Sequence, residues 1–404
     1  MSAQSGLSGL AAASRNLDVI GNNIANANTV GMKASRVEFS EVVAATLGKG
    51  GGNNDGIGVS VATVSQSFTQ GNITITGNDL DVAINGSGFF QLQMPDGTTA
   101  YSRSGQFKLD NQGNIVSNSG GKVLGYQTTT AGVPTSVTAS PLKLPTSAPI
   151  AAKQTASIMA EINLDARAPI AATVAPPTPL STYGTALTAY DSQGVNVPVS
   201  LYFKHVTPTT AGTDQWDVYG SLTGASVGSL VFNASGQLTS GSPLAMTLTP
   251  PTPSTVPAFP ITVDLSKATQ YGASFSVSNL TQDGYPPGSL TSFKIGNSGV
   301  ITTSYSNGQT QSSGMLALAD FRNMQGLAQI DGGNWVETYA SGQPIQGQPG
   351  QGKFGSTQSG ALEDANIDLT AELVNMMTAQ RAYQASAQTI KTQDQVLQTL
   401  VNLR

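Results

Sequence analysis

The chain has 404 residues, no cysteine and a single histidine, and its formal net charge is −5 at pH 7. This composition excludes disulfides, thiolate zinc sites, multi-histidine metal sites and cysteine nucleophiles, and the small acidic charge gives no support for nucleic-acid binding. Only 10% of the residues are charged, while glycine contributes 45 residues and proline 21. We therefore expect a structural or secreted protein with no cofactor and no metal, rather than an enzyme.

The beginning of the chain shows no targeting signal. Residues 1–20 have neither a cationic start nor an apolar stretch long enough for a cleaved secretion signal. No segment approaches the roughly 20 apolar residues of a transmembrane helix. Targeting signals alone therefore indicate a cytosolic protein, whereas the composition is typical of an extracellular one.

The amino-terminal segment is predicted to be an amphipathic helix. Its large apolar residues share one helical face: Leu7, Leu10, Leu17, Ile20 and Ile24. The helix is expected to end in the Asn-rich stretch 21–28, because Asn and Gly favour caps and turns over helix interiors. The Gly-rich residues 48–58 predict a flexible loop.

The middle of the chain is predicted to be β-structure. Three segments repeat an alternating strand, a polar turn with glycine and a second strand: 107–116, 232–238 and 293–301. Two stretches rich in Pro, Thr, Ser and Ala, 128–180 and 240–260, predict irregular loops or edge connections. We expect the body to consist of β-barrel or β-sandwich modules.

The carboxyl-terminal segment shows the clearest periodicity in the chain. Ten positions follow alternating spacings of four and three, a heptad pattern, and eight of them are apolar. The large apolar residues are Leu369, Leu373, Met376, Tyr383, Ile390, Leu397 and Val401, and the remaining positions are Gln380, Ala387 and Asp394. The pattern predicts a helix over 369–403, about 50 Å long, with Asp368 as its N-cap. Periodicity alone leaves two interpretations, a core helix of a globular domain or the seam of a coiled coil or helical bundle.

Three short patterns resemble catalytic or nucleotide-binding motifs and fail on context. Residues 224–228 match G-x-S-x-G, but that nucleophile needs a histidine downstream and His205 lies upstream. Residues 350–355 match G-x-G-x-x-G, and 347–353 begin a P-loop in which Phe354 replaces the Ser or Thr that holds Mg²⁺. We interpret the Gly-rich pair as a flexible turn, and we expect His205 to be structural.

Three further stretches carry a resemblance to a known family. They are NLDVIGNNIANANT at 16–29, DLDVAINGSGFF at 79–90 and ELVNMMTAQRAYQ at 372–384. They resemble the shared segments of the bacterial flagellar axial proteins, the rod and hook group. The length of the chain, its proline-rich middle and DGYPPGSL at 283–290 resemble the hook members of that group more than the shorter rod members.

The resemblance implies a mainly β body with long α-helical termini that form a coiled-coil assembly domain. Because the chain leaves the innermost part and returns to it, we expect nested, discontinuous domains. They are a terminal assembly domain with its linker (1–70 and 358–404), an inner β domain (71–145 and 285–357) and an outer β domain (146–284).

The same resemblance implies a structural subunit that polymerises into a flexible hollow tube and transmits motor torque to the filament as a universal joint. The implied partners are further copies of the chain, the flagellar rod, hook-cap and hook–filament junction proteins and the export apparatus, with no nucleic acid and no membrane. The implied location is extracellular, in the flagellum, after export without a cleaved signal peptide. A distal-rod-type axial protein and a secreted β-rich adhesin are the alternatives.

We expect the subunit-assembly interface to use the apolar stripes of both terminal helices. A helix with one uncovered apolar stripe is marginal in isolation, so the stripe needs partners. Contacts between identical subunits that do not close on themselves generate a helical filament. The predicted interface residues are Leu7, Leu10, Leu17, Ile20, Ile24, Leu369, Leu373, Met376, Tyr383, Ile390, Leu397 and Val401.

Overall fold

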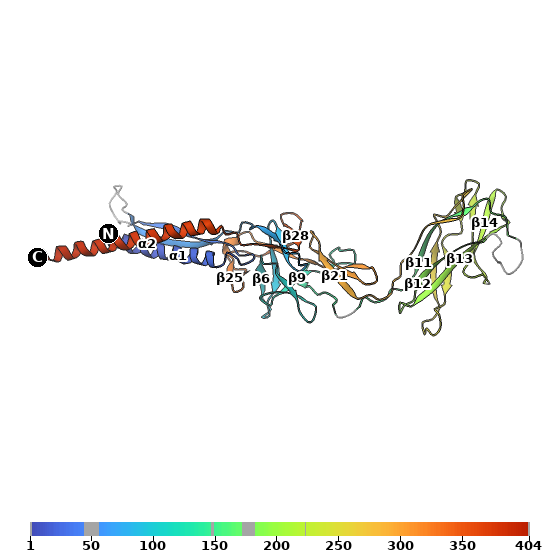
Figure 1. The fold of residues 1–404 in the computed structure, drawn as a ribbon, viewed down its shortest axis with the longest axis horizontal. Coiled ribbons are helices and arrows are strands. Elements are labelled where there is room, and N and C mark those ends of the chain that lie inside the picture. The colour runs from blue at the N-terminus through green and yellow to red at the C-terminus, as the bar shows by residue number, and fades with distance from the viewer. Residues whose placement is uncertain (1, 44–55, 147–148, 172–181, 223, 403–404) are drawn as a thin grey trace. The chain divides into compact units, whose positions relative to one another are not determined.

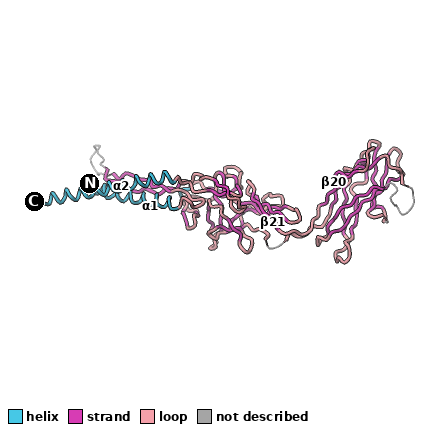
Figure 2. Tube along the Cα trace, viewed as in Figure 1, coloured by secondary structure: helices cyan, strands magenta, loops and turns pink. Residues whose placement is uncertain are grey.

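The chain folds into two compact units. The computed structural model describes residues 2–43, 56–146, 149–171, 182–222 and 224–402. The first unit comprises Met1–Ser147, Ser292–Thr303 and Thr310–Arg404, and the second comprises Ala148–Thr291 and Ser304–Gln309. Figure 2 shows that the long helices lie at the two ends of the chain and that strands make up the body between them. This confirms the predicted mainly β body with helical termini.

The elements of the first unit come from both ends of the chain. They are α1 (Ser2–Ala25), β1 (Ser35–Val43), β2 (Gly56–Gln66), β3 (Ile73–Ile75), β4 (Val82–Asn85), β5 (Phe89–Gln93), β6 (Thr99–Ser102), β7 (Phe107–Leu109), β8 (Ile115–Ser117), β9 (Lys122–Tyr126), β10 (Ser140–Pro141), β21 (Leu290–Ile295), β22 (Val300–Tyr305), β23 (Thr310–Leu316), β24 (Leu318–Asp320), the short 3₁₀ turn η1 (Met324–Gly326), β25 (Ala328–Ile330), β26 (Asn334–Val336), β27 (Ile345–Gly347), β28 (Ser356–Ser359), β29 (Ala361–Glu363) and α2 (Leu369–Asn402).

The second unit consists of strands. They are β11 (Ser157–Asp165), β12 (Thr182–Tyr190), β13 (Asn196–Val206), β14 (Thr213–Tyr219), β15 (Ser226–Asn233), β16 (Leu238–Ser240), β17 (Leu244–Leu248), β18 (Phe259–Asp264), β19 (Thr269–Tyr271) and β20 (Ser276–Gln282).

The two terminal helices pack against each other in antiparallel fashion (Figure 1). Near the start of α1, a Cβ added to Gly6 would lie 3.2 Å from Ile390 Cγ1, and one added to Gly9 would lie 3.2 Å from Ser386 Oγ. Near its end, α1 shares a groove with the first turns of α2 around Glu372. The absence of a side chain at Gly6 and Gly9 allows this close approach of the two helices.

A long hairpin of β1 and β2 packs against α1, and the sequence analysis did not predict it. Its antiparallel register pairs Ser35 with Gln66. The buried side chain of Asn23 holds the hairpin to the helix: its Nδ2 donates to the Ser35 carbonyl at 2.7 Å, and its Oδ1 accepts from the Ser35 N–H at 3.0 Å. The predicted loop at 48–58 falls mostly on 44–55, which lie outside the described residues, and β2 already includes Gly56 to Gly58.

The body of the first unit is a sheet of 13 strands whose central path runs β21-β22-β23-β9-β5-β6-β26-β25. Two separate two-stranded pairs tie the chain ends into it, because β3 pairs with β29 and β4 pairs with β28. Beside the aliphatic core, an aromatic cluster packs edge to face: Phe68, Phe89, Tyr101, Phe321 and Trp335. Strands from both halves of the chain therefore complete one folded module.

The second unit is a β-sandwich. One sheet has the order β12-β13-β14-β15-β16, and the other runs β17-β18-β11-β19 with β20 paired to β11. Both contribute to a single hydrophobic core that contains Phe203, Trp216 and Phe232. Along β13, inward and outward residues alternate throughout, which is the pattern of a strand covered on one face.

The prediction of irregular loops over 128–180 and 240–260 is wrong in part. The first stretch contains β11, a strand that pairs with three neighbours, and the second contains β17. Ile158, Ala160 and Ile162 alternate with exposed or half-buried residues along β11. This period-2 signal lies within a longer stretch rich in Pro, Thr and Ala, and the composition of the whole stretch concealed it.

The three predicted hairpins are confirmed. Strands β7 and β8 pair directly, as do β15 and β16 and also β21 and β22. The turn glycines adopt positive φ, with values of 84° at Gly113, 76° at Gly236 and 77° at Gly299. L-residues rarely adopt this conformation, so glycine fixes the position of each turn.

Candidate assembly interface

The predicted interface residues of α1 separate into inward and outward positions. Ile20 is only 5% exposed and packs within the subunit, whereas Leu7 is 63% exposed. Leu10, Leu17 and Ile24 are half-buried. The best-covered residues of the helix besides Ile20 are Ala12, Ala13, Val19 and Asn23. The inner face of α1 is therefore built largely from small residues, and Leu7 projects away from it.

The predicted interface residues of α2 also do not share one environment. Ile390 is half-buried and faces α1 near Gly6, and the buried Ala379 lines the groove beside Val19 and Ile20. Met376 is also half-buried. Leu369 and Leu373 are each 47% exposed, and Tyr383 is 38% exposed. The side chains of Leu397 and Val401 lie outside the described residues.

A physical reason for this division lies in the partner helix. Gly6 faces Ile390 and Gly9 faces Ser386, while farther along the pair Ala379 shares a groove with Val19 and Ile20. The α2 positions that face α1 therefore include small residues rather than a continuous row of large side chains. The larger apolar residues of the heptad pattern are left on other faces of α2. Within the subunit, the apolar stripe is thus only partly covered.

The start of α2 is fixed by its predicted N-cap. Asp368 Oδ1 accepts hydrogen bonds from the backbone N–H of Thr370 at 2.9 Å and of Ala371 at 3.2 Å. Glu372 follows in the first turn, where a negative charge interacts favourably with the helix dipole. The cap confirms the sequence prediction and determines which residues of the first three turns point outward.

A groove lies where α1, α2 and β1 meet. Its volume is about 250 Å³, and it is lined by Asn16, Val19, Ile20, Ser35, Arg36, Glu372, Asn375, Thr378, Ala379 and Ala382. On its rim, Arg36 forms an ion pair with Glu38 at 3.0 Å.

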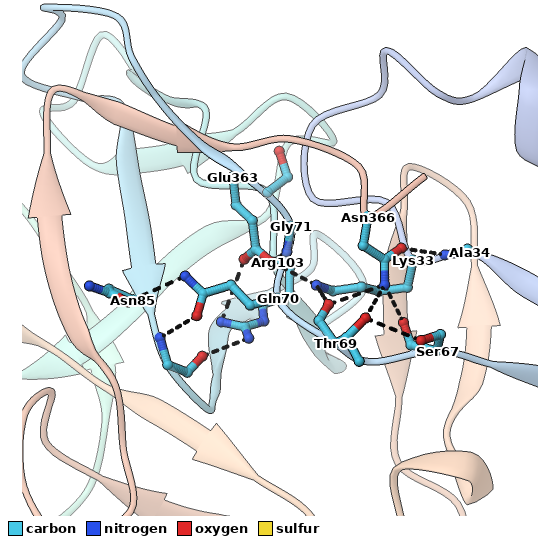
Figure 3. A network of polar contacts seen from close by, with 12 residues as sticks. Lys33, Ala34, Ser67, Thr69, Gln70, Gly71, Asn85, Arg103, Glu363 and Asn366 are labelled. Atoms are coloured by element: carbon cyan, nitrogen blue, oxygen red, sulfur yellow. Dashed lines mark hydrogen bonds and ion pairs between the residues drawn. The ribbon is translucent and has the colours of Figure 1, made fainter. Parts of the chain in front are cut away.

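A buried charged cluster joins the helical end of the first unit to its β body (Figure 3). Lys33 follows α1, Arg103 follows β6, and Glu363 ends β29 shortly before α2. Lys33 Nζ lies 2.7 Å from Glu363 Oε1, and Arg103 Nη1 lies 3.6 Å from Glu363 Oε2. The three side chains are almost completely buried. One carboxylate therefore faces two cations away from solvent.

Backbone groups add further hydrogen bonds to this cluster. Lys33 Nζ donates to the Thr69 carbonyl at 2.7 Å, and Arg103 Nη2 donates to the Gly86 carbonyl at 2.7 Å. Glu363 Oε1 also accepts from the Gly71 N–H at 2.9 Å. Burial lowers the pKa of Lys33, although the hydrogen bond and charge of Glu363 oppose that change. Burial likewise lowers the pKa of Arg103, against the attraction of Glu363.

Asn366 extends the junction toward α2. Its Oδ1 accepts from the Ala34 N–H at 2.7 Å, and its Nδ2 donates to the Ser67 carbonyl at 2.7 Å. Figure 3 shows these contacts beside Lys33 and Thr69. The segments that precede and follow the helices are thus attached to each other and to the linker after β2.

Sequence reasoning missed this junction. No periodicity marks Lys33, Arg103 or Glu363 in the sequence. The composition nevertheless offered one signal. Because only 10% of the residues are charged, each charged side chain, such as the lysine directly after Gly31 and Met32, was a candidate member of a buried ion pair.

The rejected chemical motifs have structural explanations. Ser226 begins β15, and its Oγ donates to the carbonyls of Val218 and Gly228, at 3.2 and 3.0 Å. His205 Nδ1 donates to the Ala168 carbonyl at 2.8 Å while its ring stacks on Trp216. Both residues are therefore engaged in the packing of the second unit.

Two searches of the described residues bear on other kinds of site. Within those residues, no three or more His, Cys, Asp or Glu side chains gather closely enough to hold a metal ion. None of the described helices combines the length and the apolar character that crossing a membrane requires.

Models of four protein families match successive parts of the chain. They are Flagella basal body rod protein (residues 4–33), Flagellar hook protein FlgE/F/G D1 domain (83–165), Flagellar basal body protein FlaE D2 domain (163–285) and Flagellar basal body rod FlgEFG protein C-terminal (358–403). The matches include both helical ends and most of the β body.

Curated relatives match over the full length. The flagellar hook protein FlgE of Salmonella typhimurium is 40% identical over 420 residues, covering 100% of both chains. That of Escherichia coli K12 is 40% identical over 418 residues, covering 98% of each. The chain belongs to the flagellar hook protein family. It is a structural subunit of the bacterial flagellar hook, and the hook protein family is structural rather than enzymatic.

More distant members of the hook protein family agree. The flagellar hook protein FlgE of Treponema pallidum is 32% identical over 457 residues, covering 99% of this chain and 98% of that protein. The crystal structure of Helicobacter pylori flagellar hook protein FlgE2 matches with a TM-score of 0.55 and 14% identity, covering 72% of this chain and 100% of that one. At that identity the structural match supports the fold alone. The whole-length relatives favour a hook protein over a rod protein or an adhesin.

Proposed function

We propose that the chain polymerises through the outer faces of α1 and α2 into a flexible hollow tube that transmits motor torque as a universal joint. The observation that carries this proposal is the exposure of large apolar side chains on the first three turns of α2 after α1 has packed. Leu369, Leu373, Val374 and Met377 are each about half exposed. A homopolymer is implied by membership of the hook protein family.

The size of the exposed stripe fits this role. Complete burial of a large apolar side chain contributes about 1.5–3 kcal/mol, so covering the exposed half of each of these side chains contributes roughly 1 kcal/mol. One subunit contact is therefore weak, but the same contact recurs with each added copy. Heterologous contacts that do not close produce a helical polymer.

The proposed interface keeps the twelve residues expected from the sequence and assigns them two roles. Ile20, Met376 and Ile390 hold α1 and α2 together, while Leu7 and Leu373 face neighbouring subunits. Exposure of Leu7 at the start of α1 and of Leu373 near the start of α2 supports contacts at two separate levels of the helix pair.

We also propose the nested organisation, with 1–70 and 358–404 as the assembly domain, 71–145 and 285–357 as the inner β domain, and 146–284 as the outer one. Two observations support it. The second compact unit, Ala148–Thr291 with Ser304–Gln309, interrupts the first. The two-stranded pairs β3–β29 and β4–β28 join the flanks of that interruption.

The remaining parts of the proposal rest on the family alone. Besides other copies of the chain, the proposed partners are the flagellar rod, the hook-cap and hook–filament junction proteins and the export apparatus. The proposed location is outside the cell, in the flagellum, after export without a cleaved signal peptide. Membership of the hook protein family supports these assignments.

The variant Leu373→Asp tests the polymerisation proposal. An unpaired charge in a buried contact costs several kcal/mol, so the purified full chain should stay folded but fail to form tubes on salting-out. Thr392→Asp is the matched control and should assemble normally, because Thr392 is exposed on the same helix, about 100° around the axis from Leu373 and eleven residues from Arg381. Electron microscopy of the polymer gives the readout, with curved tubes expected from the wild type. Normal tubes from Leu373→Asp would refute the proposal.

A further inference from the structure

The groove between α1, α2 and β1 contains an unsatisfied carboxylate oxygen. Glu372 Oε2 is buried and has no hydrogen-bond partner among the residues that the structure describes. Arg36, the cation among the residues that line the groove, is engaged with Glu38. Leaving a buried charged oxygen without a donor costs free energy, so the site favours an incoming cation or donor.

The outer face of α2 carries a row that complements this groove. Val374, Met377 and Arg381 follow at spacings of three and four residues, so they share one helical face. Val374 is 51% and Met377 53% exposed. Arg381 is also exposed and forms no ion pair within the described part of the chain. We call these three residues the outer row.

Helix geometry prevents the row from meeting Glu372 in its own subunit. Arg381 lies nine residues after Glu372 on the same helix. At about 100° and 1.5 Å per residue, this separation places the two side chains about 180° apart around the axis and about 13.5 Å apart along it. Any pairing between them must therefore join two copies of the chain.

We propose that the outer row of one subunit docks at the groove of a neighbouring subunit, with Arg381 forming an ion pair with Glu372. This inference rests on the proposed polymerisation through the helices and names the contact. Val374 and Met377 would cover apolar surface at the groove formed by Val19 and Ile20.

Three features favour a second copy of the chain as the occupant. Every subunit of a homopolymer presents both the groove and the row, so the contact repeats without a further partner. The charges are complementary, since the groove supplies an acid and the row a base. At about 30 Å³ per water, a groove of about 250 Å³ has the volume of about eight waters, enough for one long side chain rather than a whole helix.

Charge reversal in the full chain tests the pairing. Arg381→Glu and Glu372→Arg should each raise the concentration needed for polymerisation at fixed salt by roughly tenfold, equivalent to about 1.4 kcal/mol. The double variant Arg381→Glu/Glu372→Arg should restore assembly, because the reversed charges attract again. Lys391→Glu, which reverses another exposed cation of α2 outside the row, should assemble as the wild type does.

Each outcome has a defined meaning. Circular dichroism first confirms that each variant is folded. If Glu372→Arg disrupts the first turn of α2, Arg381→Gln and Glu372→Gln replace the reversals, and their double variant should then be no more defective than either single one. Normal assembly of both single variants, or a folded Arg381→Glu/Glu372→Arg chain as defective as either single one, would overturn the inference. Rescue of Glu372→Arg by Arg15→Glu instead would also overturn it, since the partner would then lie on α1.

The same experiment separates this inference from the proposed function. If Leu373→Asp blocks assembly while Arg381→Glu and Glu372→Arg have no effect, polymerisation through the helices stands and only this contact is refuted. If Leu373→Asp also assembles normally, the proposed function fails with it.

Discussion

Substitutions in the buried Lys33–Glu363–Arg103 cluster should have unequal effects on stability. The cluster places two cations around one carboxylate, so removing different members leaves different charges behind. Glu363→Gln keeps the size of the side chain but leaves both cations buried without an anion. Lys33→Met keeps most of the apolar stem and leaves one cation with one anion.

The expected magnitudes follow from the contacts that remain. Removing one partner of a buried charged group costs about 3–5 kcal/mol, which we expect for Glu363→Gln. In Lys33→Met, Glu363 keeps the Gly71 N–H at 2.9 Å, and the Thr69 carbonyl keeps the Asn366 amide at 3.1 Å. Since neither of these two oxygens loses its last donor and Glu363 keeps its ion pair with Arg103, the loss should be only about 1 kcal/mol.

The two tryptophans give a selective assay. Trp335 is buried in the first unit and Trp216 in the second, and the chain contains only these two. In a Trp216→Phe background, fluorescence therefore reports unfolding of the first unit alone. Urea titrations then compare the free energy of unfolding of each variant with that of the background chain.

The double variant Lys33→Met/Glu363→Gln gives the decisive comparison. Because it removes one of the two cations that Glu363→Gln leaves unpaired, it should be more stable than Glu363→Gln alone. Equal losses for the two single variants, or a double variant whose loss equals their sum, would show that the charge imbalance does not control the stability of this junction.

Two further predictions concern single carboxylates. Although partial burial opposes it, the backbone N–H groups of Ser157 and Ala156 lower the pKa of Asp283 from its ordinary value of 3.8. The stabilisation by Asp283 is present above pH 3.8 and is lost as the pH falls through the lowered pKa. Asp283→Asn should therefore flatten the decrease in melting temperature of the second unit between about pH 5 and 2. An unchanged pH profile of the melting temperature would contradict this. Asp368→Ala removes the N-cap of α2 and should cost about 1 kcal/mol, seen as weaker ellipticity at the helical band, whereas Thr370→Ala in the same turn should have little effect.

Local patterns were sufficient to predict the helical ends, the cap at Asp368 and the three hairpins with their turn glycines. Each depends on residues within a few positions of one another, where spacing and turn preferences act directly. The burial of individual helix residues was not predictable in the same way. Which face of α2 is covered depends on Gly6 and Gly9, more than 370 residues away in sequence.

The features that the sequence analysis missed depend on tertiary pairing or on a signal concealed by composition. Asn23 holds the hairpin of β1 and β2 to α1 through its hydrogen bonds to Ser35. In the sequence, Asn23 looks the same as the neighbouring Asn residues that end the helix, so this role could not be predicted. Lys33 and Glu363 are 330 residues apart, and no local pattern links them. In β11, the alternating pattern was present but was outweighed by the surrounding Pro and Thr.

The pairing of β3 with β29 and of β4 with β28 determines which of the two units can complete its fold first. Strands β28 and β29 lie within residues 356–363, near the end of the chain, whereas their partners lie before residue 86. Any process that delivers the chain from its amino terminus, translation included, presents β3 and β4 long before their partners exist. The sandwich of the second unit lies almost entirely within one continuous segment and becomes complete earlier. The first unit therefore closes after the second, and the helix pair that would recruit further copies forms only once α2 has been delivered.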